Sequence, residues 1–225
     1  MTIFSYLNNM PVFILMAGIR LLIIFTILPI HEFAHGFAAK KLGDKTALIA
    51  GRLTLNPLAH IDPIGAVLIF ICGFGWAKPV PVNPRNFKNY RRDDALVALA
   101  GPLSNLICAA AGRLVYEIIY STMSGVGMLF ALLAIEQFIM INISLAVFNL
   151  LPIYPLDGSH ILSGILPAKA NAFMYKYRTY IYYGLLFCLI FGVLDVPIFW
   201  LCGKVNQGIG LLFFWVEPLM RAVFG

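Results

Sequence analysis

An apolar run that ends in two histidines constrains this chain more than any other feature. Residues 11–30 contain a single charged side chain, Arg20, and about 20 apolar residues are enough for a helix to cross a bilayer. His31, Glu32 and His35 follow immediately, in the pattern His-Glu-x-x-His. The sequence therefore predicts a membrane-spanning helix that carries three ionisable side chains close to its end.

The spacing of the two histidines predicts a metal site. Residues four apart lie on one face of a helix, so His31 and His35 can bind the same zinc ion. Glu32 between them can act as general base for a water on that metal. The alternative is a helix with two packed histidines and an unrelated glutamate. An ionisable residue at the centre of a spanning helix costs roughly 2.5–3.5 kcal/mol, which a bound dication compensates. We therefore predict one zinc ion per chain.

The composition agrees with a membrane protein. Of the 225 residues, 61% are hydrophobic and 12% are charged, which is too little charge to cover a soluble domain. The net charge of +6 suits loops that face anionic lipid, and it requires no nucleic-acid partner. We expect a multi-pass protein of the cytoplasmic membrane whose partners are the lipid bilayer and other membrane proteins.

The hydrophobic segments predict an all-α fold with five to six transmembrane helices. A further segment, residues 64–76, has only about 13 residues, so it is either a short span or a re-entrant piece. We expect one membrane domain over residues 1–225, with additional helices at about 178–224. The five segments that approach the length of a span are residues 10–38, 94–120, 127–150, 178–201 and 207–224.

The loop charges predict an orientation. Basic residues occur both before and after residues 64–76, and the positive-inside tendency disfavours an outside position for either loop. A consistent arrangement places residues 40–93 and 152–177 in the cytoplasm and residues 121–126 outside. The segment 64–76 then re-enters from the cytoplasmic side, and the catalytic groups lie near that side.

Two loop segments are expected to be extended. Residues 52–57 and 78–84 show alternation and contain prolines, which favour strands over helix. We predict that they pair as a small membrane-associated β element. Its exposed edge could bind an unwound substrate strand, or the strands could merely pack the loop.

A catalytic zinc site usually needs a third protein ligand, and Asp157 is the best candidate. Pro152 and Pro155 break an apolar helix just before it, and unwound backbone at membrane depth is tolerated where it lines a wet cavity. Asn149 precedes Asp157 by about two helical turns. Its amide could bind substrate backbone or the developing oxyanion, or it could cap the broken helix.

The chain resembles the site-2 protease family of intramembrane zinc metalloproteases, in its short form without a PDZ domain. The resemblance covers roughly residues 10 to 165. It implies zinc held by His31, His35 and Asp157, with Glu32 as base. It further implies cleavage of substrate helices inside or beside the bilayer, often as a step of regulated signalling. The residues that carry it are 31–35, 100–105 and 149–158, the last matching Asn-x-x-Pro-x-x-Pro-x-Asp-Gly, with 51–65 and 73–84 resembling a bacterial and archaeal subgroup.

Three further polar residues have several possible roles. His60 and His160 could approach the metal, and His160 follows the Asp157 carboxylate by about one helical turn. Glu136 lies inside a predicted span, where it could bond Asn105 or Asn142, or line a water route to zinc.

We expect a metalloendopeptidase that hydrolyses peptide bonds of membrane-embedded proteins by a zinc-activated water. The alternative is a divalent-ion transporter or channel that uses the same His, Glu and Asp residues. The place of Glu32 between two ligands and the absence of repeat symmetry favour the protease. The intact motifs disfavour an inactive scaffold. The sequence identifies neither the substrate nor the oligomeric state.

Overall fold

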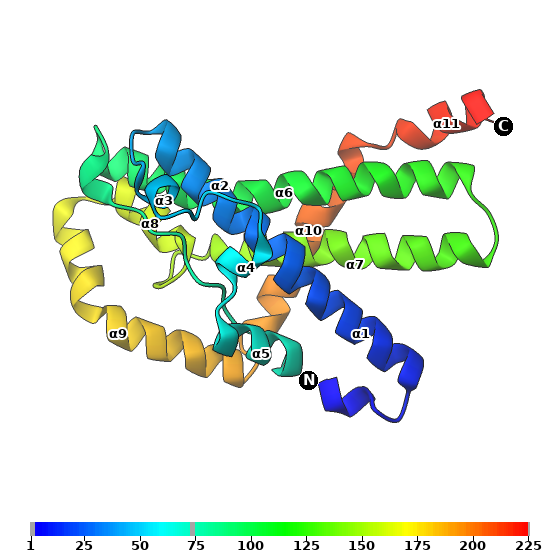
Figure 1. The fold of residues 1–225 in the computed structure, drawn as a ribbon, viewed down its shortest axis with the longest axis horizontal. Coiled ribbons are helices and arrows are strands. Elements are labelled where there is room, and N and C mark those ends of the chain that lie inside the picture. The colour runs from blue at the N-terminus through cyan, green and yellow to red at the C-terminus, as the bar shows by residue number, and fades with distance from the viewer. Residues whose placement is uncertain (1–2, 73–74, 225) are drawn as a thin grey trace. The chain divides into compact units, whose positions relative to one another are not determined.

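The fold is all-helical, as predicted. The computed structural model describes residues 3–72 and 75–224, and within these ranges it contains helices, turns and irregular loops (Figure 1). The α-helices are α1 (Met10–Leu22), α2 (Leu28–Lys41), α3 (Thr46–Ile49), α4 (Pro57–His60), α5 (Pro63–Cys72), α6 (Tyr90–Thr122), α7 (Val126–Asn149), α8 (Asp157–Ile165), α9 (Ala168–Ile190), α10 (Asp195–Leu212) and α11 (Val216–Phe224).

The chain packs into two compact units. The first comprises Met1–Ser104 and His160–Ile165, and the second comprises Asn105–Ser159 and Leu166–Gly225. Helices α6 and α8 contribute residues to both units. The two histidines of the predicted metal site lie in the first unit, on α2.

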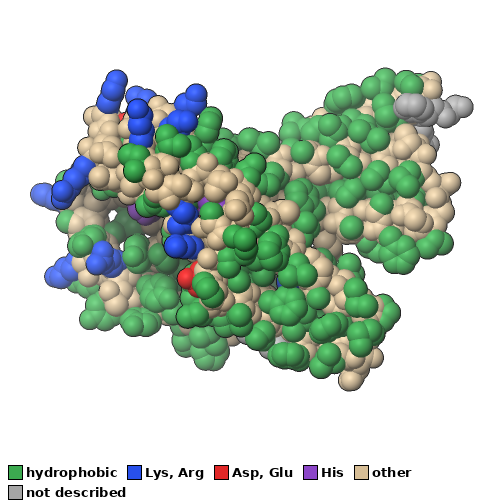
Figure 2. Space-filling view, viewed as in Figure 1, with side chains coloured by type: hydrophobic (Ala, Val, Ile, Leu, Met, Phe, Trp, Pro, Cys, Tyr) green, Lys and Arg blue, Asp and Glu red, His purple; other side chains and the backbone are tan. Residues whose placement is uncertain are grey.

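Four helical stretches of the described residues are long and apolar enough to cross a membrane: Met10–Lys41, Tyr90–Thr122, Val126–Asn149 and Asp195–Met220. The protein is therefore a multi-pass membrane protein. Hydrophobic side chains cover much of the face seen in Figure 2, as expected for a surface in contact with lipid.

The first three stretches agree with the predicted spans, but the C-terminal part is divided differently. The predicted span 178–201 is interrupted by a turn at residues 191–194, where Gly192 adopts a positive φ of 67°. Helix α10 then covers the end of that predicted span and the start of the next one, 207–224. The hydrophobicity runs on through this turn, so the hydrophobic pattern could not reveal it.

A π-helical turn, η2 (Ile23–Ile27), lies directly before the histidines. Pro29 has no N–H to donate to the preceding turn, and Thr26 Oγ1 donates to the Leu22 carbonyl at 2.5 Å. Both features disturb the regular hydrogen bonding, and the wider turn accommodates them. Helix α2 then continues as a regular α-helix through His31 and His35.

Helix α5 does not cross the membrane by itself, because its 10 residues extend only about 15 Å against a hydrocarbon core of about 30 Å. The chain returns beside it: a Cβ on Gly65 would lie 2.0 Å from the Trp76 carbonyl oxygen, and one on Gly75 would lie 2.2 Å from the Gly65 carbonyl oxygen. This geometry agrees with the predicted re-entrant segment. Residues 73–74 of that segment lie outside the described residues.

A buried arginine anchors the far end of α5. Arg20 of α1 donates from Nη1 to the carbonyl oxygens of Phe70 and Ile71, at 2.6 and 2.7 Å. Carbonyls in the last turn of a helix lack partners within that helix, and a cation there also complements the helix dipole. The one charge of the first apolar run thus holds the end of α5.

The predicted β element is wrong for the described residues, because residues 52–57 and 78–84 form no strand. The second segment instead uses its N–H groups elsewhere: Lys78 donates to the His60 carbonyl and Val80 donates to Glu32 Oε2, both at 2.9 Å. Too few donors then remain for a ladder with residues 52–57, since three other positions are prolines without an N–H: Pro79, Pro81 and Pro84.

The core of the second unit lies between α7 and α10. Ile139, Ile143 and Val147 of α7 pack with Cys202 and Ile209 of α10. Such close packing between apolar helices gives this unit its rigidity.

Two asparagines are buried in the same unit. Asn105 Nδ2 donates to Asn142 Oδ1 at 3.0 Å, and Asn142 Nδ2 donates to the Phe138 carbonyl at 2.9 Å. These two asparagines bond to each other, and Glu136 is exposed on α7, so its role stays a prediction.

Candidate metal centre

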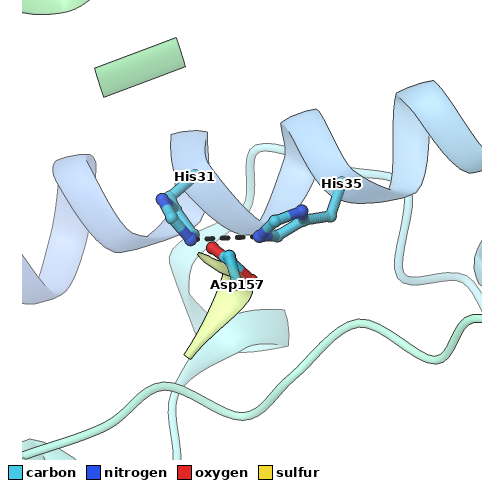
Figure 3. Close-up of side chains that lie close together, drawn as sticks. All are labelled: His31, His35 and Asp157. Carbon is cyan, nitrogen blue, oxygen red and sulfur yellow. Dashed lines mark hydrogen bonds between the residues drawn. The ribbon is translucent and has the colours of Figure 1, made fainter. Parts of the chain in front are cut away.

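The two histidines of α2 converge as their spacing predicts. His31 and His35 are 6% and 9% exposed, and their Nε2 atoms lie 3.0 Å apart (Figure 3). The rings meet edge to face, with centroids 4.7 Å apart and an interplanar angle of 83°. Both imidazoles therefore present the same nitrogen to one point beside the helix.

A backbone carbonyl fixes the tautomer of His35. Its Nδ1 lies 2.8 Å from the carbonyl oxygen of Val97 on α6, and a carbonyl can only accept. Nδ1 therefore carries the hydrogen, and the lone pair of the neutral ring is on Nε2. This is how metal-binding histidines are commonly oriented, with the second nitrogen bonded to a carbonyl or carboxylate.

Gly101 of α6 leaves room for the two rings. A Cβ at this position would lie 2.4 Å from His35 Nε2 and 2.7 Å from His31 Cε1. Any other residue would push a side chain into the place where the two nitrogens converge. The glycine in the 100–105 motif is thus needed for space.

Asp157 is the first residue of α8, and the later turns of this helix belong to the first unit. His160 Nδ1 lies 2.9 Å from Asp94 Oδ2, and a Cβ on Gly164 would lie 2.8 Å from Ala95 Cβ, so these turns pack on the start of α6. These later turns of α8 are therefore fastened to α6 within the first unit.

The three predicted ligands form one group. A nitrogen of each histidine and a carboxylate oxygen of Asp157 all lie within 4.8 Å of one another (Figure 3). Ligands that surround one zinc ion at about 2.0–2.2 Å are separated by distances in this range. Two imidazoles and one carboxylate are also a usual donor set for catalytic zinc, with a fourth position left for water or substrate. The residues present therefore fit one zinc ion.

The glycine that follows Asp157 in the 149–158 motif is required by the turn before it. A Cβ on Gly158 would lie 2.3 Å from the carbonyl oxygens of both Leu150 and Leu151. Only glycine permits the chain to fold back this closely after α7. Asp157 is thereby held at the point where the chain turns into α8.

Glu32, between the two histidines, is half-buried and held by the backbone. Its Oε2 accepts a hydrogen bond from the Val80 N–H at 2.9 Å. One carboxylate oxygen is thus fixed by a neutral donor, and the other is not used in that bond.

Comparison with known proteins gives the family. The model for peptidase family M50 matches residues 114–192, a stretch that includes Asp157. A Bacillus subtilis (strain 168) protein provisionally named zinc metalloprotease YwhC is 41% identical over 195 residues, covering 84% of this chain and 85% of that protein. The chain belongs to the M50 family. It is a zinc metalloprotease of the site-2 protease type, which confirms the resemblance inferred from its motifs.

More distant relatives are also named as zinc metalloproteases. Rip2 of Mycobacterium tuberculosis (strain Erdman), another provisional name, is 34% identical over 167 residues, or 65% of this chain and 60% of Rip2. MJ0392 of Methanocaldococcus jannaschii is 25% identical over 152 residues, 68% of this chain but 35% of MJ0392. The chain therefore spans little more than a third of the archaeal protein. No solved structure matches this chain.

The remaining histidines of this M50 protein lie outside the group of three ligands. His60 is buried and its Nε2 bonds the Thr54 carbonyl at 2.7 Å, so it holds the loop before α4. His160, half-exposed, faces Asp94 and fastens α8. Neither is a ligand in the group that the structure brings together.

Asn149 is the last residue of α7, and its Nδ2 donates to the Leu145 carbonyl of the same helix at 3.0 Å. This bond holds the side chain against its own helix. The second hydrogen of Nδ2 and the Oδ1 atom take no part in it, and the role of Asn149 stays a prediction.

Sequence reasoning missed three groups that support the site: the Val97 carbonyl, the Val80 N–H and the Asp44 carboxylate, which binds the segment containing Val80. The first two are backbone groups, which no residue pattern can mark. Asp44 follows the end of α2 and precedes Thr46, an arrangement typical of a side chain that bonds the local backbone. That signal indicated a turn but not what the turn holds.

Proposed function

We propose that this protein cleaves membrane-embedded protein substrates, at a zinc ion held by His31, His35 and Asp157. The observation that supports this most strongly is the group of three ligands beside Glu32, at the end of a helical stretch long enough to span a bilayer. A site at that place reaches peptide bonds at or below the lipid surface. We further propose that it faces the cytoplasmic side of the cytoplasmic membrane, because most Lys and Arg residues flank it in residues 40–92.

Each side chain has a separate task in the proposed reaction. Zinc, when bound, polarises the scissile carbonyl and makes a coordinated water more acidic. Glu32 takes the proton of the attacking water and passes it to the leaving amine. Because Val80 holds Oε2, the oxygen that carries this proton is Oε1. The Val97 carbonyl keeps the His35 ring in the orientation that directs Nε2 at the metal.

Asn149 is proposed to bind the substrate. Its free amide hydrogen could donate to a substrate carbonyl or to the oxyanion, while its bond to Leu145 limits its rotation. Replacing it with alanine should then lower turnover or raise KM while the zinc content stays the same. We also propose that residues 1–225 act as one catalytic domain, with the core at about 10–165.

The test is a comparison of wild type with Glu32→Gln in native membranes. Glutamine keeps the size and can still accept from Val80 N–H through its amide oxygen, but it cannot take a proton. We expect zinc content to be unchanged and cleavage to fall by about 10²–10⁴-fold. Quantitative membrane proteomics should then show membrane-protein fragments that remain uncut only in the variant. Full cleavage by Glu32→Gln, or an altered flux of divalent ions with no uncut substrate, would contradict the proposal.

A further inference from the structure

A loop segment crosses α2 at the proposed catalytic base. We call residues 78–87 the strap. Val80, 8% exposed, donates its N–H to Glu32 Oε2, and its side chain packs on α2 at Gly36, where a Cβ would lie 3.2 Å from Val80 Cγ1. The strap therefore contacts the metal-binding helix at the residues that directly follow His31 and His35, without contributing a ligand.

Asp44 fastens the other end of the strap. It is 1% exposed, and its Oδ2 accepts from the Asn83 N–H at 2.7 Å while Oδ1 accepts from Asn86 Nδ2 at 2.7 Å. Oδ1 also accepts from the N–H and hydroxyl of Thr46, at 3.0 and 2.5 Å. Two of these four donors belong to the strap, and the other two belong to the turn that follows α2.

The chemistry of this cluster requires a carboxylate. All four groups around Asp44 are donors, and only an ionised carboxyl offers acceptors alone on both oxygens. Burial raises the pKa of the Asp44 carboxyl, but the hydrogen bonds from Thr46, Asn83 and Asn86 outweigh it, so this pKa lies below its ordinary value. The strap is also held by apolar contacts of Phe87 and Val82 with Ala39.

These contacts connect Asp44 to the base through one short segment. Asn83 is three residues from Val80, so the bond to Asp44 limits how far the Val80 N–H can move from Glu32. We propose that Asp44 is a positioning residue for the peptidase reaction: by fastening the strap, it keeps Val80 N–H on Glu32 Oε2 and thereby directs Oε1 for proton transfer. This inference rests on the proposed role of Glu32 as base.

The decisive variant is Asp44→Asn, tested in the full-length protein in detergent. The amide has nearly the same size, but its NH₂ group must face a donor, either Asn83 N–H or the pair Thr46 and Asn86. Thr46→Val is the matched control, because it removes a donor to the same carboxylate and, of the contacts with the strap, only the long 3.4 Å bond that Thr46 Oγ1 accepts from Asn86 Nδ2. Asn86→Ala is a second, milder variant, which removes one strap bond and keeps Asp44.

Three quantities are measured for each variant: hydrogen exchange in the strap, zinc content and turnover. Backbone hydrogen exchange by mass spectrometry reports protection of the amides in residues 78–87, and zinc is measured by elemental analysis. Turnover is measured on unstructured β-casein as the probe. For Asp44→Asn we expect exchange in the strap to rise by at least tenfold, with kcat lower by about tenfold and KM and zinc content unchanged. Asn86→Ala should show the same pattern at smaller size, and Thr46→Val should show neither change.

The outcomes are separable. Unchanged strap exchange in Asp44→Asn, or a loosened strap with unchanged kcat, would overturn the positioning role. An equal effect of Thr46→Val would mean that Asp44 serves only the local turn. If Glu32→Gln retains full turnover, the proposed base is wrong, whatever the strap does. Glu32→Gln should leave exchange in residues 78–87 close to the wild-type rate, because glutamine still accepts from Val80.

Discussion

Helix α2 and the C-terminal helix α9 differ in how their polar side chains are accommodated. Around α2, buried polar groups are held by specific partners: His35 by the Val97 carbonyl, Glu32 by the Val80 N–H, and Asp44 by four donors. Along α9, by contrast, most side chains are exposed, and charged groups such as Arg178 lie over aromatic rings, 4.3 Å from the Tyr175 centroid.

This difference indicates which region is sensitive to substitution. Polar groups in a low-dielectric interior are stable only if each has its partner, so the surroundings of α2 tolerate little change. A helix such as α9, whose side chains are mostly exposed, has few specific contacts to lose and tolerates much more. Substitutions in the two regions should therefore differ strongly in their effects.

The largest effect is expected at Gly101. Gly101→Ala places a methyl group 2.4 Å from His35 Nε2, inside the space that a zinc ion would need. We expect zinc content to fall below a tenth of the wild-type value and proteolysis to fall at least 100-fold, since catalysis requires the metal. Elemental analysis and β-casein cleavage measure the two.

Gly127→Ala on α7 is the matched control, because a Cβ there meets nothing within 4 Å. Its zinc content and activity should equal those of wild type. Normal zinc binding by Gly101→Ala would show that the site is not packed as tightly as the structure indicates.

An intermediate effect is expected where α8 is fastened. Asp94→Ala removes the partner of His160, whose side chain is 50% exposed, and exposed ion pairs are worth about 0.2–1 kcal/mol. The weaker hold on Asp157 should raise the Kd for zinc by up to about fivefold. Competition with a chelator of known affinity measures this change.

Arg85→Ala provides the control for Asp94→Ala, since it alters an exposed side chain outside this pair. A loss of zinc binding by more than 100-fold in Asp94→Ala would mean that Asp94 does more than fasten the helix.

Asp44 should make part of the stability pH-dependent. Its pKa is lowered in the folded protein, so its contribution is present above the unfolded carboxyl pKa of about 4 and is lost as the pH falls through the folded value. Wild type should exceed Asp44→Asn by about 1–3 kcal/mol at neutral pH. Thermal unfolding in detergent between pH 3 and 7 should show this difference shrinking at the acidic end. If the stability difference between wild type and Asp44→Asn stays constant over this range, the ionised form of Asp44 does not stabilise the fold.

The smallest effect is expected in α9. Gly184→Ala adds a Cβ in open space within this helix, so zinc content and cleavage should not change. Replacing a helical glycine by alanine should even stabilise the protein, by about 0.5–1 kcal/mol. The unfolding temperature in detergent measures it. A clear loss of activity would show that α9 is as sensitive to substitution as the surroundings of α2.

The sequence predicted the metal centre better than the surrounding loops. His31 and His35 converge because helical spacing is a short-range rule, and Asp157 was found because two prolines mark a break in a helix. The division of residues 178–224 was not predicted, since hydrophobicity alone does not show a turn such as that at Gly192. The prediction of strands at 52–57 and 78–84 was wrong because strand propensity does not show which partners the backbone N–H groups bind. In the second segment those partners are the carboxylates of Glu32 and Asp44.

The most direct test of the central claim is X-ray absorption spectroscopy of the purified zinc-loaded protein, together with its zinc content. The account predicts one zinc per chain, bound by two imidazole nitrogens and by oxygen at about 2.0–2.2 Å. It also predicts that Asp157→Ala loses the carboxylate oxygen, so that water is the remaining oxygen ligand, while both imidazoles remain. A metal bound by sulfur, a spectrum without imidazole, or an unchanged spectrum in His31→Ala and His35→Ala would contradict it.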